Sequence, residues 1–239
     1  MSEQPNPPLV WAREQRAPRR QAPGVDRIVA AAVAIADAEG LDALSMRRVA
    51  TDLGTGTTSL YRYVAGRDDL LDLMVDAVRS ERPPHPLDGD WRTDLAAVAR
   101  HLREDLLRHR WLGGIMMSRP SLGPNSLRQM DHALAAAAAL TPDATLGNSA
   151  IRTLYHYVLG AVSDELTEQD TRRRTGLTEQ QWQASVGPYL REIVASGEYP
   201  HFARVVIEAE HPDTGQRFEF GLDCLLAGLG TLAARAAEG

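Results

Sequence analysis

Residues 57–64, TTSLYRYV, bring together the side chains with the most distinctive chemistry in this sequence. A helix over this segment with Leu60 and Val64 inward turns hydroxyl, phenol and guanidinium groups outward. These groups belong to Thr58, Ser59 and Arg62, flanked by Tyr61 and Tyr63. Such a helix fits the major groove of DNA, where these groups can meet base edges and phosphates. A helical hairpin with a solvated polar face is the alternative.

Other candidate sites lack the spacing that catalysis or metal binding requires. The seven histidines form no HExxH motif and no His/Cys cluster. His101 and Asp105 share a helix face, but a satisfied or solvated pair is the simpler interpretation. His156, Ser163 and Asp164 could be assembled into a hydrolytic set, yet no GxSxG or glycine-rich phosphate loop accompanies them. The sequence therefore predicts no enzyme, no metal site and no cofactor.

Composition is that of a globular chain with room for two modules. Of 239 residues, 44% are hydrophobic, and the formal net charge is −6. The single cysteine, Cys224, excludes an intramolecular disulfide and lies in an apolar run that predicts burial. No apolar stretch approaches the ~18 residues of a membrane span, and the N-terminus lacks the apolar core of a signal peptide. We expect a cytoplasmic protein without a membrane partner.

Charge is unevenly placed along the chain. Residues 43–67 carry four arginines and one acidic residue, whereas the residues on either side carry more acidic than basic groups. A short cationic window on an anionic body is compatible with a local nucleic-acid contact.

The elements around this window predict a small helical domain. Apolar residues recur at helical spacing from Val25 to a stop at Gly40, and Ser45 is placed to cap a second helix ending near Asp52. Glycines in the following turn lead to the third helix, and a longer helix covers about 68–79 before three prolines. We therefore predict a three-helix helix-turn-helix domain over 24–68, preceded by a disordered arm over 1–23.

The remainder, 69–239, predicts a second helical domain, so the fold class is all-α. Helices are expected from Trp91 after an Asp90 cap, over about 125–140, from a Thr141 cap to Leu166, from about residue 178 and over about 216–237. Irregular backbone is expected at Gly113-Gly114 and again at residues 118–120, Ser-Arg-Pro. Residues 167–177 predict a polar loop, and residues 203–210 a helix or loop.

Residues 26–78 resemble the DNA-binding domain of the TetR family of bacterial transcriptional repressors. The resemblance runs from the first helix through GLDALSMRRVA to SLYRYV and the DLL that opens the fourth helix. Near the C-terminus, FEFGLDCLLAGL over 218–229 is similar, more loosely, to the branch typified by the tetracycline repressor.

The resemblance implies a ligand-responsive repressor that binds a palindromic operator in double-stranded DNA as a homodimer and is released by a small-molecule inducer. It places Arg47 on the second helix, Tyr61 at a phosphate-contacting position, and Arg67 where the fourth helix touches the DNA backbone. The implied DNA-binding set is Arg47, Thr57, Thr58, Ser59, Tyr61, Arg62, Tyr63 and Arg67. Arg62-Tyr63 replaces a Trp-His pair common in the tetracycline repressor branch, which suggests a different operator.

The inducer pocket is expected between Trp91 and Tyr157, where backbone breaks leave space among apolar and a few polar side chains. Candidate ligand-binding residues are Trp91, His101, Trp111, Met116, Met117, Met130, Tyr155 and His156. They suit a largely hydrophobic molecule. We expect the helix over 68–79 to couple this pocket to the DNA-binding domain.

Dimerisation is expected through the helices near 143–166 and 216–237, because Gly221 and Gly228, seven residues apart, allow close approach of a partner helix. Two other hypotheses stay open at this stage. One is a constitutive dimeric DNA-binding protein without an inducer, for which the C-terminal core would be tightly packed. The other is an enzyme on a helical scaffold, which would need a demonstrated turnover.

Overall fold

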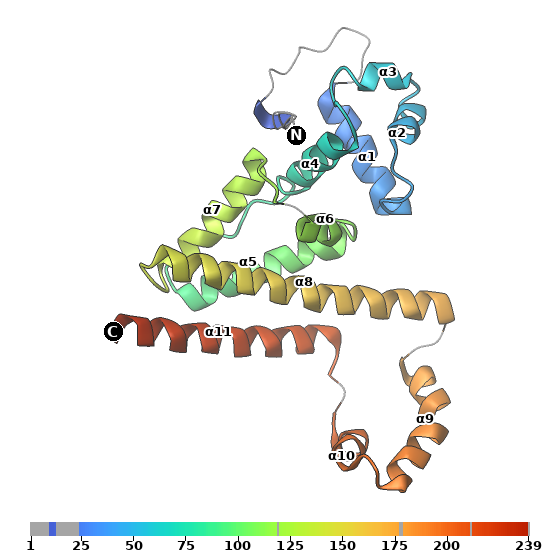
Figure 1. The fold of residues 1–239 in the computed structure, drawn as a ribbon, viewed down its shortest axis with the longest axis vertical. Coiled ribbons are helices and arrows are strands. Elements are labelled where there is room, and N and C mark those ends of the chain that lie inside the picture. The colour runs from blue at the N-terminus through green and yellow to red at the C-terminus, as the bar shows by residue number, and fades with distance from the viewer. Residues whose placement is uncertain (1–9, 13–23, 119, 177–178, 211, 239) are drawn as a thin grey trace, which may run out of the picture.

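The computed structural model describes residues 10–12, 24–118, 120–176, 179–210 and 212–238, and within these residues it contains helices and no strand (Figure 1). The predicted all-α fold is confirmed. The α-helices are α1 (Val25–Glu39), α2 (Met46–Asp52), α3 (Thr57–Leu60), α4 (Arg67–Val78), α5 (Trp91–Arg108), α6 (Leu112–Ser118), α7 (Pro124–Ala138), α8 (Ala144–Thr175), α9 (Glu179–Ser196), α10 (Pro200–Glu208) and α11 (Thr214–Glu238).

Helices α1 to α3 form a small N-terminal head that packs on α4 (Figure 1). Local signals end α1 and begin α2 where the sequence predicted. Gly40 ends α1 with φ of +84°, a left-handed conformation that costs glycine little. The Ser45 hydroxyl accepts the Arg48 backbone N–H at 3.1 Å and so caps α2.

The third helix is shorter than predicted. α3 ends at Leu60, and the chain tightens there because the Tyr63 N–H donates to the Leu60 carbonyl at 2.8 Å, a three-residue spacing. Leu60 and Val64 are nevertheless fully buried, as expected. The polar residues on the other side therefore still face outward.

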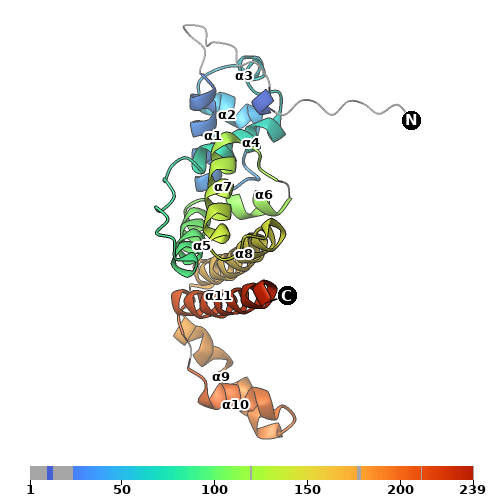
Figure 2. The same ribbon diagram turned by 90° about the vertical axis from the view of Figure 1, so that its left-hand side faces the viewer.

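The C-terminal domain is built around α5, α7, α8 and α11. The long helices α8 and α11 lie side by side and run in opposite directions, while α5 and α7 cover α8 on the side that faces the head (Figures 1 and 2). Helix α4 connects the two domains, packing on α1 at one side and on α7 at the other.

Helix α8 is longer than the sequence predicted. The expected polar loop over 167–177 is wrong, because the helix continues to Thr175 and ends at Gly176 with φ of +67°. Glu168 pairs with Arg172 one turn later and with Arg217 of α11, so the charged residues stabilise the helix. At the other end Asp143 rather than Thr141 is the cap, accepting the Thr145 N–H at 2.8 Å.

Two other expectations are corrected, and one alternative that the sequence left open, helix or loop over 203–210, is decided. Gly113 and Gly114 lie inside α6, which is held by the buried Leu112 and Ile115, so the break predicted at these glycines is wrong, whereas α6 does end at Ser118, where the second break was predicted. Residues 203–210 are mainly helical, as part of α10. Cys224 is exposed, because it lies on the face of α11 opposite Leu222 and Leu226.

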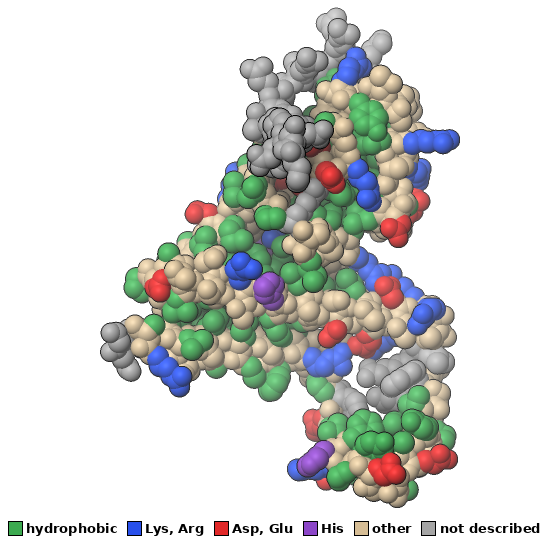
Figure 3. Space-filling model, in the orientation of Figure 1, with side chains coloured by type: hydrophobic (Ala, Val, Ile, Leu, Met, Phe, Trp, Pro, Cys, Tyr) green, Lys and Arg blue, Asp and Glu red, His purple; other side chains and the backbone are tan. Residues whose placement is uncertain are grey.

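Helices α9 and α10 form an arm that projects beyond the α8 and α11 layer (Figures 1 and 2). No described side chain of α10 is buried, and hydrophobic side chains gather on the arm surface (Figure 3). The large exposed ones are Tyr189, Tyr199, Phe202, Val205 and Ile207. An apolar surface of this kind is typical of a contact with another molecule.

Of the predicted N-terminal arm, residues 1–9 and 13–23 lie outside the described residues. Val10–Ala12 form a single 3-10 turn that packs against α4 with Val10 buried. In the part of the chain that the structure covers, no helix is both long and apolar enough to cross a bilayer.

Candidate DNA-binding surface and ligand cleft

The residues predicted to contact DNA gather on the outer surface of the head. Five of the eight are exposed, namely Arg47, Thr58, Tyr61, Arg62 and Arg67, and three are half-buried, namely Thr57, Ser59 and Tyr63. Tyr63 packs against the core, so it supports the turn after α3. The side chains that remain available to base edges or phosphates come from α2, from α3 and from the turn that follows α3.

Two of the head's arginines are already occupied by protein groups. Arg67 donates to the Leu41 carbonyl at 2.8 Å, which fixes the start of α4 against the turn after α1. Arg48 pairs with Glu39 at 2.6 Å. By contrast, the guanidinium groups of Arg47 and Arg62 form no ion pair within the described residues. They are the head cations best placed to bind a polyanion.

A cleft of about 890 Å³ opens among α6, α7 and α8. Methionines and Leu159 supply its apolar walls, and α8 supplies most of its polar groups. The lining residues are Met116, Met117, Ser118, Pro120, Met130, Asn148, Arg152, Tyr155, His156, Leu159, Gly160, Ser163 and Asp164. Its size and mixed lining match the pockets that hold drug-sized molecules.

Five of the eight predicted ligand-binding residues line this cleft: Met116, Met117, Met130, Tyr155 and His156. The other three do not. Trp91 packs beside Gly230 of α11, Trp111 is buried against α1, and His101 lies in a water-sized cavity of about 10 Å³ that shares Tyr155 with the cleft.

Sequence reasoning missed the polar stripe that α8 presents to the cleft. Asn148, Arg152, His156 and Ser163 recur at spacings of four and seven residues, which places them along one side of a helix. The same periodicity that identified the buried side of α8 could have identified this opposite one. The stripe gives the cleft a cation, Arg152, and the neighbouring Asp164 of α8 adds a carboxylate.

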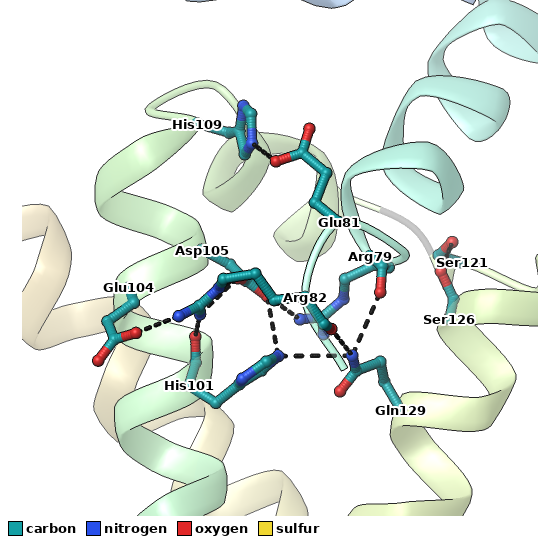
Figure 4. Close-up of polar contacts among 10 residues, drawn as sticks. All are labelled: Arg79, Glu81, Arg82, His101, Glu104, Asp105, His109, Ser121, Ser126 and Gln129. Atoms are coloured by element: carbon teal, nitrogen blue, oxygen red, sulfur yellow. Dashed lines mark hydrogen bonds and ion pairs between the residues drawn. The ribbon is translucent and has the colours of Figure 1, made fainter. Parts of the chain in front are cut away.

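A buried ionic network lies next to the cleft, at the end of α4 (Figure 4). Asp105 of α5 accepts hydrogen bonds from Arg79 at 3.2 Å and from Arg82 Nη2 at 2.7 Å. Arg82 also pairs with the exposed Glu104. His101 Nε2 lies 3.6 Å from Asp105. The carboxylate therefore serves two arginines and joins the end of α4 to α5.

Burial shifts the pKa values of His101 and Tyr155, which line the small cavity beside the cleft. It lowers the pKa of His101, and Arg82 and Arg79 lower it further, although Asp105 acts in the opposite direction. Burial raises the pKa of the Tyr155 hydroxyl, an effect that Arg79 partly offsets. Tyr155 is thus held as a neutral hydroxyl at the point where α4, the network and the cleft meet.

Helix α4 is also fixed to α7, which carries Met130 into the cleft. The buried carboxylate of Asp76 accepts the backbone N–H groups of Asn125 and Ser126, both at 2.9 Å. These are N–H groups of the first turn of α7, so Asp76 caps a helix other than its own. Gly123 permits the close approach, because a Cβ there would overlap Asp76.

Comparison with known proteins identifies both domains. Residues 28–74 match the family described as "Bacterial regulatory proteins, tetR family", and residues 83–233 match the "Tetracyclin repressor-like, C-terminal domain". The HTH-type transcriptional repressor DrrR1 of Streptomyces coeruleorubidus is 45% identical over 232 residues, covering 95% of this chain and 85% of DrrR1.

Solved structures agree with these matches. Apo ActR of Streptomyces coelicolor superposes with a TM-score of 0.77 at 32% identity, covering 92% of this chain and 100% of ActR. ActR in complex with actinorhodin superposes with a TM-score of 0.70 at 34% identity, covering 87% and 96%. The chain thus has a helix-turn-helix head and a helical domain with a ligand-sized cleft, and known proteins match both domains. The chain belongs to the TetR family of bacterial transcriptional regulators, which are ligand-responsive DNA-binding proteins and not enzymes.

Proposed function

We propose that this protein represses transcription by binding a palindromic operator as a homodimer, and that a small molecule in the cleft among α6, α7 and α8 releases it. The observation that carries the proposal is the connection of the cleft to the head. Tyr155 lines the cleft and lies beside Arg79 at the end of α4. Met130 also lines the cleft, and it belongs to α7, the helix that Asp76 of α4 caps. A regulator of this kind acts where the chromosome is, in the cytoplasm.

The cleft also separates this proposal from the constitutive alternative. A DNA-binding protein without an inducer would have no need of a space of about 890 Å³ beside the helix that carries its head. The proposed domains are the head over 24–68 and the ligand-binding and dimerisation domain over 69–239.

For DNA, we propose contacts from the eight head residues named above, with Arg47 and Arg62 as the main ones. Arg62→Ala is expected to weaken binding to the operator by about 5- to 150-fold, the equivalent of roughly 1 to 3 kcal/mol for a base contact. Tyr61→Phe is expected to weaken binding to all DNA sequences alike, because a phosphate contact carries no sequence information. Fluorescence anisotropy at fixed salt, on an operator selected from genomic fragments, measures both.

Arg235→Ala is the matched control for these substitutions. It removes an exposed arginine from the last turn of α11, far from the head along the chain. Equal operator affinity in Arg62→Ala, Arg47→Ala and the wild type would show that the outer face of α2 and α3 does not enter the groove.

For the inducer, we propose a mainly apolar molecule of drug size that carries polar groups toward α8. The methionines can adapt to its shape, and Arg152, His156 and Tyr155 can hydrogen-bond its polar groups. ActR, a related protein of 34% identity, was solved with actinorhodin. Actinorhodin is therefore a suitable first probe.

Gly160→Leu tests the cleft directly. A Cβ at Gly160 meets no atom within 4 Å, so the larger side chain should extend into the cleft without displacing the protein, and leucine favours the helix. We expect at least a tenfold loss of actinorhodin affinity by calorimetry, with operator affinity retained. Gly114→Leu on α6 is the control, since that glycine is also in open space but does not line the cleft. Equal ligand binding by both variants would place the ligand elsewhere.

The proposed homodimer uses α8, α11 and the α9–α10 arm. One face of α11 carries Phe220, Cys224, Ala227 and Thr231, all exposed and at helical spacing. Gly221, expected on this seam, instead packs against Tyr157 of α8 within the same chain, whereas Gly228 is in open space as expected. A second copy that covers this face can also cover the apolar surface of the arm.

A further inference from the structure

The head is joined to the C-terminal domain at a second place besides α4. The Trp111 indole N–H donates to Asp37 Oδ1 of α1 at 2.7 Å. His109 Nδ1 lies 2.9 Å from the same oxygen, and its Nε2 lies 3.1 Å from Glu81 Oε2 in the segment after α4. Both rings are buried, at 6% and 4% exposure, and their centroids are 5.8 Å apart. We call Asp37, His109 and Trp111 the α1 latch.

The position of the latch in the chain connects it to the cleft. His109 ends α5, and Trp111 immediately precedes α6, whose buried Leu112 and Ile115 hold that helix to the core. Met116 and Met117 of the same short helix line the cleft. A ligand that displaces α6 must therefore move Trp111, which is one residue from its first turn.

The contacts of the latch make partial opening unfavourable. A buried indole N–H or imidazole that loses its acceptor is left unsatisfied, so intermediate positions of α1 are disfavoured. Asp37 is partly exposed, with a side-chain exposure of 33%, and can meet water when the latch opens. Opening is then unfavourable mainly because the buried rings of Trp111 and His109 lose their hydrogen-bond acceptor.

We infer that the α1 latch holds the head in its operator-binding orientation and that α6 transmits ligand binding to α1 by opening it. This inference rests on the proposed function and adds a route to the head that is separate from α4. Asp37, His109 and Trp111 act as positioning residues, because they are outside the proposed DNA-binding set and do not line the cleft. A ligand shifts the head only by its preference for the open latch.

Trp111→Phe and Asp37→Asn test the inference, since the first removes the N–H while keeping a ring and the second removes the charge while keeping an acceptor. We expect each to reduce ligand-free operator affinity by about tenfold and to reduce the factor by which actinorhodin weakens operator binding. By linkage, actinorhodin should bind the DNA-free variants more tightly than the wild type. The double variant should lose less than the sum of the two single losses, because both substitutions weaken the same Trp111–Asp37 contact.

Amide hydrogen exchange supplies a readout that needs neither ligand nor operator. Opening the latch should speed exchange in α1 and α6 of both variants, whereas Trp91→Phe and Asp26→Asn, the same replacements away from the latch, should leave it unchanged. If actinorhodin leaves operator binding of the wild type unaffected, the proposed induction by this ligand fails. The hydrogen exchange rates and the ligand-free operator affinities still test the latch in that case. Wild-type exchange and operator affinity in both latch variants would overturn the inference.

Discussion

Replacing Asp105 with asparagine is expected to lower the free energy of unfolding by about 3 to 5 kcal/mol, the loss typical of breaking a buried ion pair on one side. Asp105 is 4% exposed and is the carboxylate shared by Arg79 and Arg82. Asparagine keeps the shape but leaves the buried guanidinium of Arg79 without a counter-charge. Urea denaturation followed by circular dichroism, at one protein concentration, measures the change.

Glu104→Gln is the matched control, because Glu104 pairs with the same Arg82 but its side chain is 59% exposed. An exposed pair contributes between 0 and about 1 kcal/mol. A similar loss in both variants would show that burial of Asp105 is not what makes the network important. A large loss in Asp105→Asn alone would establish the network as the structural anchor of α4.

Replacing Phe220 with glutamate is expected to produce a monomer that binds the operator about 10² to 10⁴ times more weakly, since the second half-site is no longer bound in an intramolecular step. Phe220 lies on the proposed dimer face and is 73% exposed, so the substitution does not disturb packing within one chain. Sedimentation equilibrium gives the oligomeric state and anisotropy gives the operator affinity.

Leu127→Glu on α7 serves as the control for Phe220→Glu. It places the same charge on another exposed apolar residue, outside the proposed dimer face. The pair of measurements separates assembly from a general effect of added charge. A dimeric Phe220→Glu protein with unchanged operator affinity would remove this face of α11 from the interface.

The head could be predicted from sequence because its boundaries depend on neighbouring residues. Ser45 and Gly40 act within one helical turn, and the inward positions of Leu60 and Val64 follow from helical spacing alone. The residues proposed to face DNA then follow as the other side of the same helix. Only the length of α3 was overestimated, since a tight turn and a helix share the same local spacing.

The site that links the domains could not be predicted in the same way. Asp37 and Trp111 are 74 residues apart, and Asp76 and Ser126 are 50 apart, so no local pattern joins them. Local composition also led to two wrong expectations. Charges over 167–177 suggested a loop although their pairing supports a helix, and the apolar surroundings of Cys224 suggested burial although its own position faces outward.

The contact between Asp76 and Gly123 has an evolutionary consequence. A Cβ at position 123 would overlap the carboxylate that caps α7, so a larger residue there can be inherited only after position 76 has changed. Losing the carboxylate first leaves two backbone N–H groups without their acceptor. The two positions therefore constrain each other's mutational paths, and among descendants of this gene they should change together or not at all.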